Sequence, residues 1–208
     1  MQYFVLAVLW IAWCVLHSAM ISISVTDYLK RRLGQAFRFY RLTFNMVALL
    51  TLVPVAMYER AIHGYWAFWW EGSNVFLQIM LIAIAFLLFL AGARHYDFLE
   101  FAGLRQIREG ISGTTLSKTD DLDTKGILGI IRHPWYTGSI VIIWARDLTQ
   151  ATVVTNIILT VYLIVGAHLE ERKLAMKYGQ KYRTYQEKVP MFIPCKFSKS
   201  KGQKEGGA

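Results

Sequence analysis

The stretch around which the rest of the chain is organised reads Asp123-Thr124-Lys125-Gly126-Ile127-Leu128-Gly129-Ile130-Ile131-Arg132-His133-Pro134-Trp135-Tyr136-Thr137-Gly138. Proline has no backbone N–H and disfavours helix at the residue before it, so Pro134 predicts that a loop ends and a helix begins here. A second polar stretch contains Glu170-Glu171-Arg172, Tyr182, Tyr185 and Val189-Pro190. One apolar hairpin separates the two stretches, so we expect them to return to the same membrane face and to form one site.

The composition indicates a membrane protein. The chain has 208 residues, of which 55% are hydrophobic and 14% aromatic, and its mean hydropathy is +0.34. A soluble domain of this size is less apolar. A bilayer core of roughly 30 Å needs about 20 apolar residues as helix, and the apolar runs cover residues 1–24, 42–58, 75–93, 135–145 and 151–167. We therefore predict an all-α, polytopic membrane helical bundle of about five transmembrane helices, in which the fourth is a short or tilted arm of a hairpin.

The positions of the basic residues predict the orientation. Cytoplasmic loops of membrane proteins carry the excess of Lys and Arg. All but two of the 23 basic residues follow the first, third or fifth apolar run, and the exceptions are Arg60 and Arg146. We expect the N-terminus outside and the C-terminus in the cytoplasm. The expected membrane is a bacterial inner membrane. The net charge of +9 then reflects topology and attraction to anionic membrane lipid, and no nucleic acid is expected as a partner.

The chain divides into three parts by composition. Residues 1–94 hold the first three spans, and residues 64–70 within them form an aromatic segment suited to the headgroup region. Residues 95–194 contain a polar loop with an amphipathic turn at 98–107, the hairpin and both polar stretches. Residues 195–208 are rich in Lys, Gly and Ser and are predicted to be disordered.

The two polar stretches resemble, in order and spacing, the integral-membrane methyltransferases typified by isoprenylcysteine carboxyl methyltransferase. The matching positions are Gly126, Arg132, His133, Pro134, Tyr136, Gly138, Glu170, Glu171, Gly179, Tyr182, Tyr185, Val189 and Pro190. Leu16-His17-Ser18 and His95 are similar to the bacterial methanethiol S-methyltransferase and NnrU-like branch. The resemblance covers residues 120–194 best.

The resemblance implies transfer of a methyl group from S-adenosylmethionine, at the cytoplasmic membrane surface, to a small or lipophilic acceptor. It places the catalytic portion at the cytoplasmic face in residues 95–194. A helix that starts at proline attracts a carboxylate, and the methyl donor carries one. No metal is required. The cofactor-binding residues that it implies are Leu122, Leu128, His133, Pro134, Trp135, Tyr136 and Glu170.

Two roles are open for the glutamate pair. The apolar run ends at residue 167, so we expect Glu170 and Glu171 near a helix C-terminus, where the helix dipole disfavours negative charge. Arg172 or Lys173 could compensate this charge structurally. Alternatively, Glu170 accepts hydrogen bonds from the ribose or the ammonium group of the cofactor, as the glutamate of the family does.

The expected acceptor is a thiol. The prenylcysteine enzymes carry an acceptor-binding arginine one turn before the glutamate pair, where this chain has Gly166 and His168. This difference disfavours a free prenylcysteine carboxylate as the substrate. Histidine titrates near neutral pH and can take a thiol proton, so His17 and His95 are the candidate catalytic residues.

Three alternatives differ in class or in substrate. His17 and His95 as a pair would also suit a haem-binding, NnrU-like membrane protein, which a Soret band would reveal. A methyltransferase could instead act on a prenylcysteine carboxylate or a phospholipid amine. The third alternative is a structural scaffold without activity.

Overall fold

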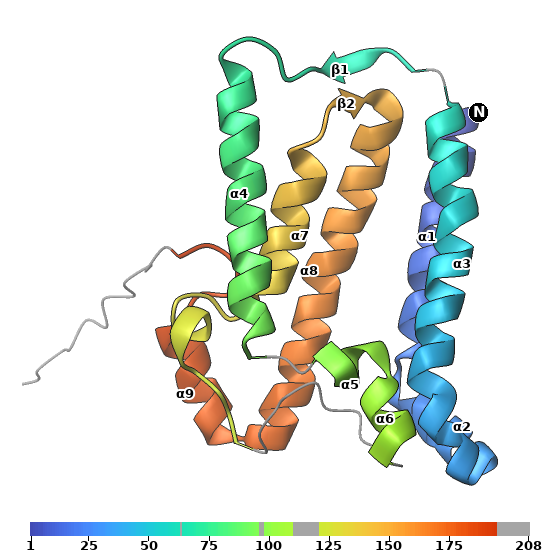
Figure 1. Cartoon of the computed structure of the whole chain (residues 1–208), viewed down its shortest axis with the longest axis vertical. Coiled ribbons are helices and arrows are strands. Elements are labelled where there is room, and N and C mark those ends of the chain that lie inside the picture. The colour runs from blue at the N-terminus through green and yellow to red at the C-terminus, as the bar shows by residue number, and fades with distance from the viewer. Residues whose placement is uncertain (63, 96–97, 110–120, 195–208) are drawn as a thin grey trace, which may run out of the picture.

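The computed structural model describes residues 1–62, 64–95, 98–109 and 121–194, and in these ranges the protein is a bundle of long helices (Figure 1). The helices that run along the bundle axis are α1 (Gln2–Met20), α3 (Tyr40–Ala61), α4 (Asn74–Ala93), α7 (Pro134–Trp144) and α8 (Gln150–Tyr178). The shorter elements are α2 (Ile23–Leu33), the 3-10 helix η1 (Gly34–Phe39), β1 (Trp66–Phe68), α5 (Phe98–Ala102), α6 (Leu104–Glu109), the 3-10 helix η2 (Gly126–Gly129), β2 (Leu148–Thr149) and α9 (Gln180–Lys188). The predicted all-α class is confirmed.

Four segments of the described chain are long and apolar enough to cross a membrane. They are α1, the 39 residues from α2 through α3, α4 and α8. Their apolar side chains point mostly outward, because only 11% of the most apolar window of α4 is buried within the protein. A protein in water rarely exposes so much contiguous apolar surface. These helices therefore face lipid, and the chain is a polytopic membrane protein.

Helix α8 lies between two helix pairs. It packs against α1, which packs against α3, and against α7, which packs against α4. Small residues bring α7 and α4 close together, since a Cβ atom at Gly138 would lie only 3.3 Å from the carbonyl oxygen of Ala85. The polar segments before α7 and after α8 are thereby held at the same end of the bundle.

Helix α7 is the short arm that the sequence predicts. Its 11 residues span roughly 16 Å, about half of a bilayer core. The last carbonyl groups of a helix have no partner within it, and lipid offers no water to replace one. Side chains from three other parts of the chain donate to the carbonyls at and just beyond the end of α7, namely Asn156 Nδ2 to Ile143 O (2.7 Å), Gln78 Nε2 to Ala145 O (2.9 Å) and Trp70 Nε1 to Arg146 O (3.1 Å).

The two short strands join the loop after α3 to the tip of the hairpin (Figure 1). They are antiparallel, with Trp66 opposite Thr149 and Phe68 opposite Leu148. The side chains of Trp66 and Phe68 stay exposed. The aromatic segment therefore lies over the end of the short arm, and this position agrees with a headgroup location.

Helix α8 corrects one prediction. It begins at the Thr149–Thr152 capping box and continues without interruption to Tyr178. Glu170 and Glu171 are thus about two turns inside the helix and not at its C-terminus. The residues after them, Arg172 to Tyr178, are mostly good helix formers, so the helix continues after the apolar run has ended. The dipole argument for compensation by Arg172 or Lys173 is therefore wrong.

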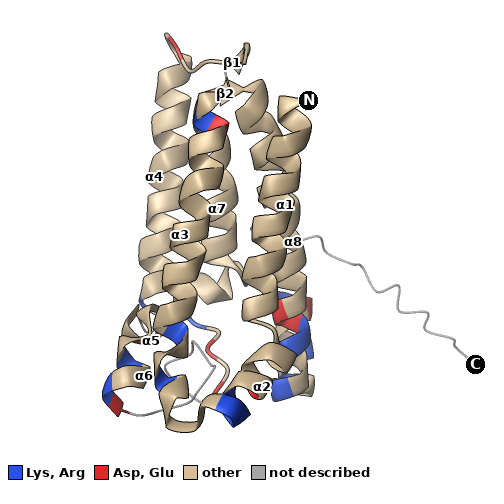
Figure 2. Ribbon diagram, turned by 90° about the vertical axis from the view of Figure 1, so that its right-hand side faces the viewer, with Lys and Arg blue, Asp and Glu red and all other residues tan. Residues whose placement is uncertain are grey.

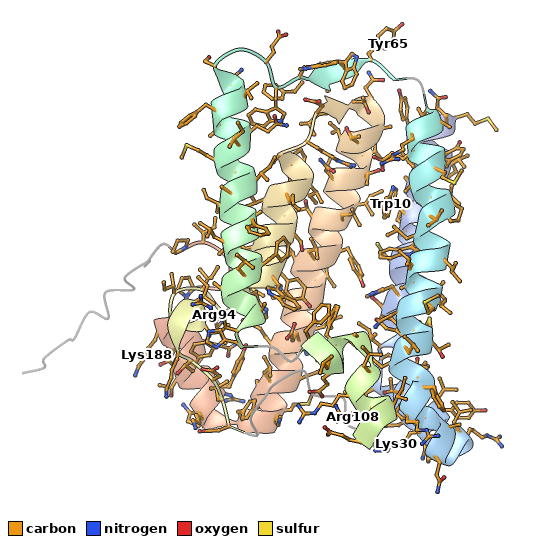
Figure 3. The ribbon with its side chains drawn as sticks, in the orientation of Figure 1. Trp10, Lys30, Tyr65, Arg94, Arg108 and Lys188 are labelled. Carbon is orange, nitrogen blue, oxygen red and sulfur yellow. The ribbon has the colours of Figure 1, made fainter. Side chains whose placement is uncertain are left out.

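Charge separates the two ends of the bundle. Lys and Arg gather at the end that carries α2, α5 and α6 (Figure 2), and α9 lies at this end too. We name it the basic end, and we name the opposite end, with β1 and β2, the aromatic end. Figure 3 shows Lys30, Arg94, Arg108 and Lys188 toward the basic end and Tyr65 at the aromatic end.

Other element boundaries differ modestly from the predictions. The first run, predicted as residues 1–24, ends at Met20, because Ser22 caps a separate helix, α2. The second run extends to residues 40–61, with Pro54 inside the helix. The predicted amphipathic turn at 98–107 is present as α5 and α6. The predicted tail at 195–208 and residues 110–120 of the polar loop lie outside the described residues.

Candidate functional site

The two polar stretches meet at the start of α7. His133 is the residue before the helix and Pro134 is its first residue, as predicted from the proline. The backbone N–H groups of Arg132 and His133 donate to the carbonyl oxygens of Pro190 and Met191, at 3.0 and 3.1 Å. These bonds fix the segment after α9 against the entry to α7, so the second stretch forms one wall of the same site.

Arg132 and Glu171 form a buried ion pair at the centre of this site. Arg132 Nε lies 2.6 Å from Glu171 Oε1, and the two side chains are 9% and 10% exposed. Arg132 Nη1 also donates to the carbonyl oxygens of Gln186 and Val189. A buried ion pair of this kind stabilises the fold when its polar atoms also have hydrogen-bond partners. Arg132 therefore joins the start of α7 to α8 and α9.

Glu171 is fully engaged by the protein. Its Oε2 accepts from Gln186 Nε2 at 2.8 Å, and its Oε1 is 3.3 Å from His133 Nε2 as well as bonded to Arg132. A carboxylate only accepts hydrogen bonds, so His133 is the donor in that contact. Glu171 therefore acts as a structural centre of the cluster.

Glu170, unlike Glu171, is partly exposed and has few contacts with the rest of the protein. Its side chain is 34% exposed, and its carboxylate comes within 4.0 Å of His133 Nδ1. The described residues show no other hydrogen bond or ion pair for it. Glu170 therefore has oxygen atoms available to accept from a ligand, directly beside the buried ion pair.

Tyr136 and Gly166 form a flat surface next to Glu170. The Tyr136 ring meets His133 edge-on, with 5.3 Å between ring centroids. A Cβ atom at Gly166 would be 3.4 Å from Tyr136 Cε1, so glycine lets the ring lie against α8. His133, Tyr136 and Glu170, three of the predicted cofactor residues, are thus brought together.

The loop before α7 packs on α9. The Leu128 side chain is buried and its carbonyl oxygen accepts from the Tyr185 hydroxyl at 2.5 Å. Burial raises the pKa of Tyr185 to about 12, so the phenol keeps its proton and stays a donor. Leu122 packs on the buried cluster of Tyr182, Tyr185 and Val189. Both predicted loop leucines are therefore positioned by α9.

His95 anchors the same loop. Its Nδ1 lies 2.7 Å from Asp123 Oδ2, and a Cβ atom at Gly126 would be only 2.9 Å from its Nε2. Burial raises the pKa of Asp123, but the hydrogen bonds from His95 and the Lys125 backbone N–H, together with the charges of both residues, lower it on balance. The contacts of His95 are thus those of a residue that positions the loop.

His17 lies elsewhere, between α1 and α8. Its Nδ1 is 2.7 Å from the Tyr162 hydroxyl, and its ring packs against Trp13 and Phe44. No described contact joins His17 to His95, so the structure does not bring the two candidate catalytic histidines together. The described residues also contain no group of three or more metal-ligating side chains.

Trp135 contacts α4 and α5. Its indole Nε1 donates to the carbonyl oxygen of Phe89 on α4 at 3.1 Å, and its ring meets Phe101 edge-on. The indole therefore ties the start of α7 to α4 and α5. Its predicted contact with a cofactor stays a prediction, as do those of the other residues.

An apolar hollow of about 360 Å³ lies on the surface of α4 and η2. None of the predicted site residues lines it, and its walls are almost wholly aliphatic. It is therefore a lipid-facing surface and not the candidate site. Its lining residues are Ile84, Leu87, Leu88, Leu90, Ala91, Arg94 and Ile127.

The cluster is built by Arg132, Glu171, Gln186 and Tyr185. Arg132, Glu171 and Tyr185 are motif positions in the sequence, but the motif does not assign them these contacts, and it does not include Gln186. A signal was present for two of them. Arg132 directly precedes the helix start and Glu171 follows the hairpin, so opposite charges at the two ends of one hairpin could have been paired. Nothing in the sequence pattern identifies Gln186 as the donor to Glu171.

The chain matches a known protein family. The sequence profile of the NnrU protein family matches residues 5–193. This range includes every residue of the cluster. No solved structure is significantly similar to the chain.

Several relatives are methanethiol S-methyltransferases. The one from Pseudomonas sp. is 39% identical over 75 residues, which are 36% of this chain and 28% of the relative. Methanethiol S-methyltransferase 1 of Bradyrhizobium diazoefficiens is 30% identical over 133 residues, 62% of this chain and 46% of the relative. The protein from Crocosphaera subtropica is 30% identical over 132 residues, 60% of this chain and 50% of the relative. The chain thus spans half or less of the length of these relatives.

Proposed function

The chain belongs to the NnrU protein family, and from this membership together with the cluster around Glu170 we propose that it is a membrane methyltransferase that uses S-adenosylmethionine. The proposed acceptor is a small or lipophilic thiol. Relatives that share up to 39% identity over the matched region are named methanethiol S-methyltransferases, which supports both the reaction and the thiol.

The observation that carries the proposal is the unequal use of the two glutamates. Arg132, His133 and Gln186 all contact Glu171. Within the described part of the chain, Glu170 has only the distant contact with His133. A partly exposed carboxylate that the protein leaves available, beside a rigid buried cluster, suits recognition of a ligand's hydroxyl or ammonium groups. S-adenosylmethionine carries both.

The residues present fit the methyl donor. Glu170 would accept from its ribose or ammonium, and the ring of Tyr136 over Gly166 offers a flat face for the adenine. His133 and Pro134 at the start of α7, with Leu128, Leu122 and Trp135 around them, complete the residues that we propose to hold it. When bound, S-adenosylmethionine supplies a methyl group on a positively charged sulfur.

The contribution of the chain is to orient the reactants and exclude water. Arg132 and Glu171 hold the wall rigid, and Tyr185 fixes the loop through Leu128. Orientation of two reactants alone can lower a barrier by several kcal/mol. A site that excludes water also favours a reaction in which positive charge is neutralised. Membrane lipid would form the remaining boundary, so that an apolar thiol can enter from the bilayer.

We also propose that residues 95–194 form the methyltransferase portion and that the basic end faces the cytoplasm of a bacterium, at the inner membrane. Single cysteines in place of exposed Glu71 and Lys188, in a cysteine-free background, test the orientation. An impermeant thiol reagent should label only the cysteine at position 71 from outside intact cells. Labelling of both positions from the same side would refute the topology.

The function is tested with purified protein in detergent. Titration calorimetry with S-adenosylmethionine should show saturable binding, and labelled S-adenosylmethionine with methanethiol should yield volatile label. Label found only in a carboxyl ester or in a phospholipid amine would refute the thiol and leave the methyltransferase. Absence of binding in folded protein would refute the proposal, and a Soret band would support the haem-binding alternative.

A further inference from the structure

A second polar cluster lies inside the membrane-spanning part of the bundle. Its members are His17 and Ser18 on α1 and Tyr162 on α8. His17 Nδ1 is 2.7 Å from the Tyr162 hydroxyl, and Ser18 Oγ donates to the same oxygen at 3.3 Å. Ionisable and polar groups are costly in a spanning helix and usually mark a functional site.

The hydrogen bonds of the cluster assign the tautomer of His17. Of the two groups near the Tyr162 hydroxyl in the described residues, His17 Nδ1 at 2.7 Å is the closer acceptor for its proton, and Ser18 Oγ, at 3.3 Å, donates to it. A phenol proton without a partner would be costly in an apolar setting. Tyr162 therefore donates to Nδ1, and the neutral imidazole carries its proton on Nε2. That nitrogen makes no hydrogen bond within the described residues. It is also not fully buried, so a ligand atom can reach it.

The cluster continues the face of α8 that carries the candidate site. Tyr162, Gly166 and Glu170 are spaced by four residues, so they lie along one side of the helix, with about 6 Å between successive positions. Tyr136 covers Gly166, the middle position. His17 thus contacts α8 about two turns from Glu170, on the side toward the membrane interior.

We propose that His17, held by Tyr162 and Ser18, donates a hydrogen bond from Nε2 to the sulfur of the methyl acceptor, bound as a thiolate. This inference rests on the proposed function. The thiol releases its proton to water on binding. The thiolate sulfur then forms a bond to the methyl carbon while the bond from that carbon to the donor sulfur breaks, and the electron pair of the broken bond stays on the donor sulfur. A neutral thioether results.

The charge near His17 suits an anionic sulfur. The Arg41 guanidinium lies over the Phe44 ring, 5.4 Å from its centroid. The same ring contacts His17, with 4.9 Å between centroids. A cation on the ring that contacts the imidazole attracts an anionic sulfur bound nearby. His17 is therefore better suited to donate a hydrogen bond, whereas the sequence predicted that it would take a thiol proton.

The tautomer is measured by nitrogen NMR of the full-length protein with labelled histidine rings, and the His17 signals are assigned by their loss in His17→Gln. His17 should carry its proton on Nε2. His168 is the internal control, because its Nδ1 lies 2.8 Å from the Ile164 carbonyl oxygen, which only accepts, so its proton must be on Nδ1. Protonation of His17 on Nδ1 in the wild-type protein would overturn the inference, whatever the enzyme assays show.

Matched substitutions separate a donor from a base. The amide nitrogen of glutamine can replace Nε2–H, whereas that of asparagine replaces Nδ1–H, and neither amide can take a proton. With methanethiol as acceptor, His17→Gln should keep most of the turnover, while His17→Asn should lose about tenfold or more. Equal losses in both variants would overturn the donor role.

Tyr162→Phe tests the positioning residue. It should let the imidazole populate both tautomers in the NMR spectrum and lower turnover, while the affinity for S-adenosylmethionine stays within about twofold. An unchanged His17 spectrum in Tyr162→Phe would refute the positioning role. Failure of the wild-type protein to bind S-adenosylmethionine would instead refute the proposed function, and with it the thiolate, independently of the tautomer.

Discussion

An arginine–glutamate ion pair stands at each end of the short helix α7. Arg132 and Glu171 are 2.6 Å apart at the basic end, and Arg146 and Glu59 are 3.1 Å apart at the aromatic end. Each pair joins the helix to another part of the chain, α8 in the first case and α3 in the second. The two ends therefore use the same chemistry to hold a helix that is too short to cross the bilayer alone.

The two ends differ in whether a carboxylate beside the ion pair is available to a ligand. At the aromatic end both oxygens of Glu59 are taken, one by Arg146 and one by Thr155 at 2.7 Å, and the neighbouring carboxylate, Asp147, accepts from the Trp70 backbone N–H at 3.1 Å. At the basic end Glu171 is equally engaged, but Glu170 next to it has oxygen atoms available. An ion pair thus holds α7 in place at each end, and the partly exposed carboxylate beside the basic-end pair marks the candidate site.

The largest effect is expected from breaking the basic-end pair. Arg132→Ala leaves Glu171 charged, buried and unpaired, which should lower the free energy of unfolding by about 3–5 kcal/mol. Cofactor binding should be lost with it. Denaturant unfolding in detergent and titration calorimetry measure the two effects.

The control removes both charges of the same pair. Arg132→Met combined with Glu171→Met should recover much of the stability, because no buried charge is left unpaired. If Arg132→Ala were as stable as the wild-type protein, the ion pair would not hold the wall.

The matched change at the aromatic end should be smaller and should spare binding. Arg146 is 39% exposed, and Glu59 keeps its bond from Thr155, so Arg146→Ala should cost about 1–3 kcal/mol of unfolding free energy. Affinity for S-adenosylmethionine should stay within about twofold, since distant sites act independently. A tenfold weaker affinity in this variant would show that the two ends are not separate, and would break the comparison.

A smaller change sharpens the account of the basic end. Tyr185→Phe removes the hydrogen bond to the Leu128 carbonyl and should cost about 1 kcal/mol, with a modest loss of cofactor affinity. Tyr182→Phe is the matched control, because the Tyr182 hydroxyl makes no hydrogen bond within the described residues. Equal effects of the two variants, measured by unfolding and calorimetry, would mean that the bond to Leu128 does not fix the loop.

Local rules explain what the sequence predicted. Pro134 fixed the start of α7, and Arg146-Asp147 marked its end, so the short arm was found within one residue at each end. The position of Glu170 within its helix was missed, because the end of an apolar run marks the membrane boundary and not the helix end. The partners of His17 and His95 could not be predicted, since Tyr162 and Asp123 are 145 and 28 residues away and only the packed chain brings them near.

The central claim is that Glu170, and not the cluster that supports it, binds the methyl donor. Glu170→Gln keeps the size of the side chain and removes its charge, and a charge-assisted hydrogen bond contributes about 1.5–3 kcal/mol. Titration calorimetry with S-adenosylmethionine should therefore show about tenfold or more weaker binding, while the unfolding free energy stays within about 0.5 kcal/mol. Exposed Glu187→Gln, on α9, should change neither quantity. Unchanged affinity in Glu170→Gln, together with a less stable hairpin, would contradict the account and make Glu170 a structural residue.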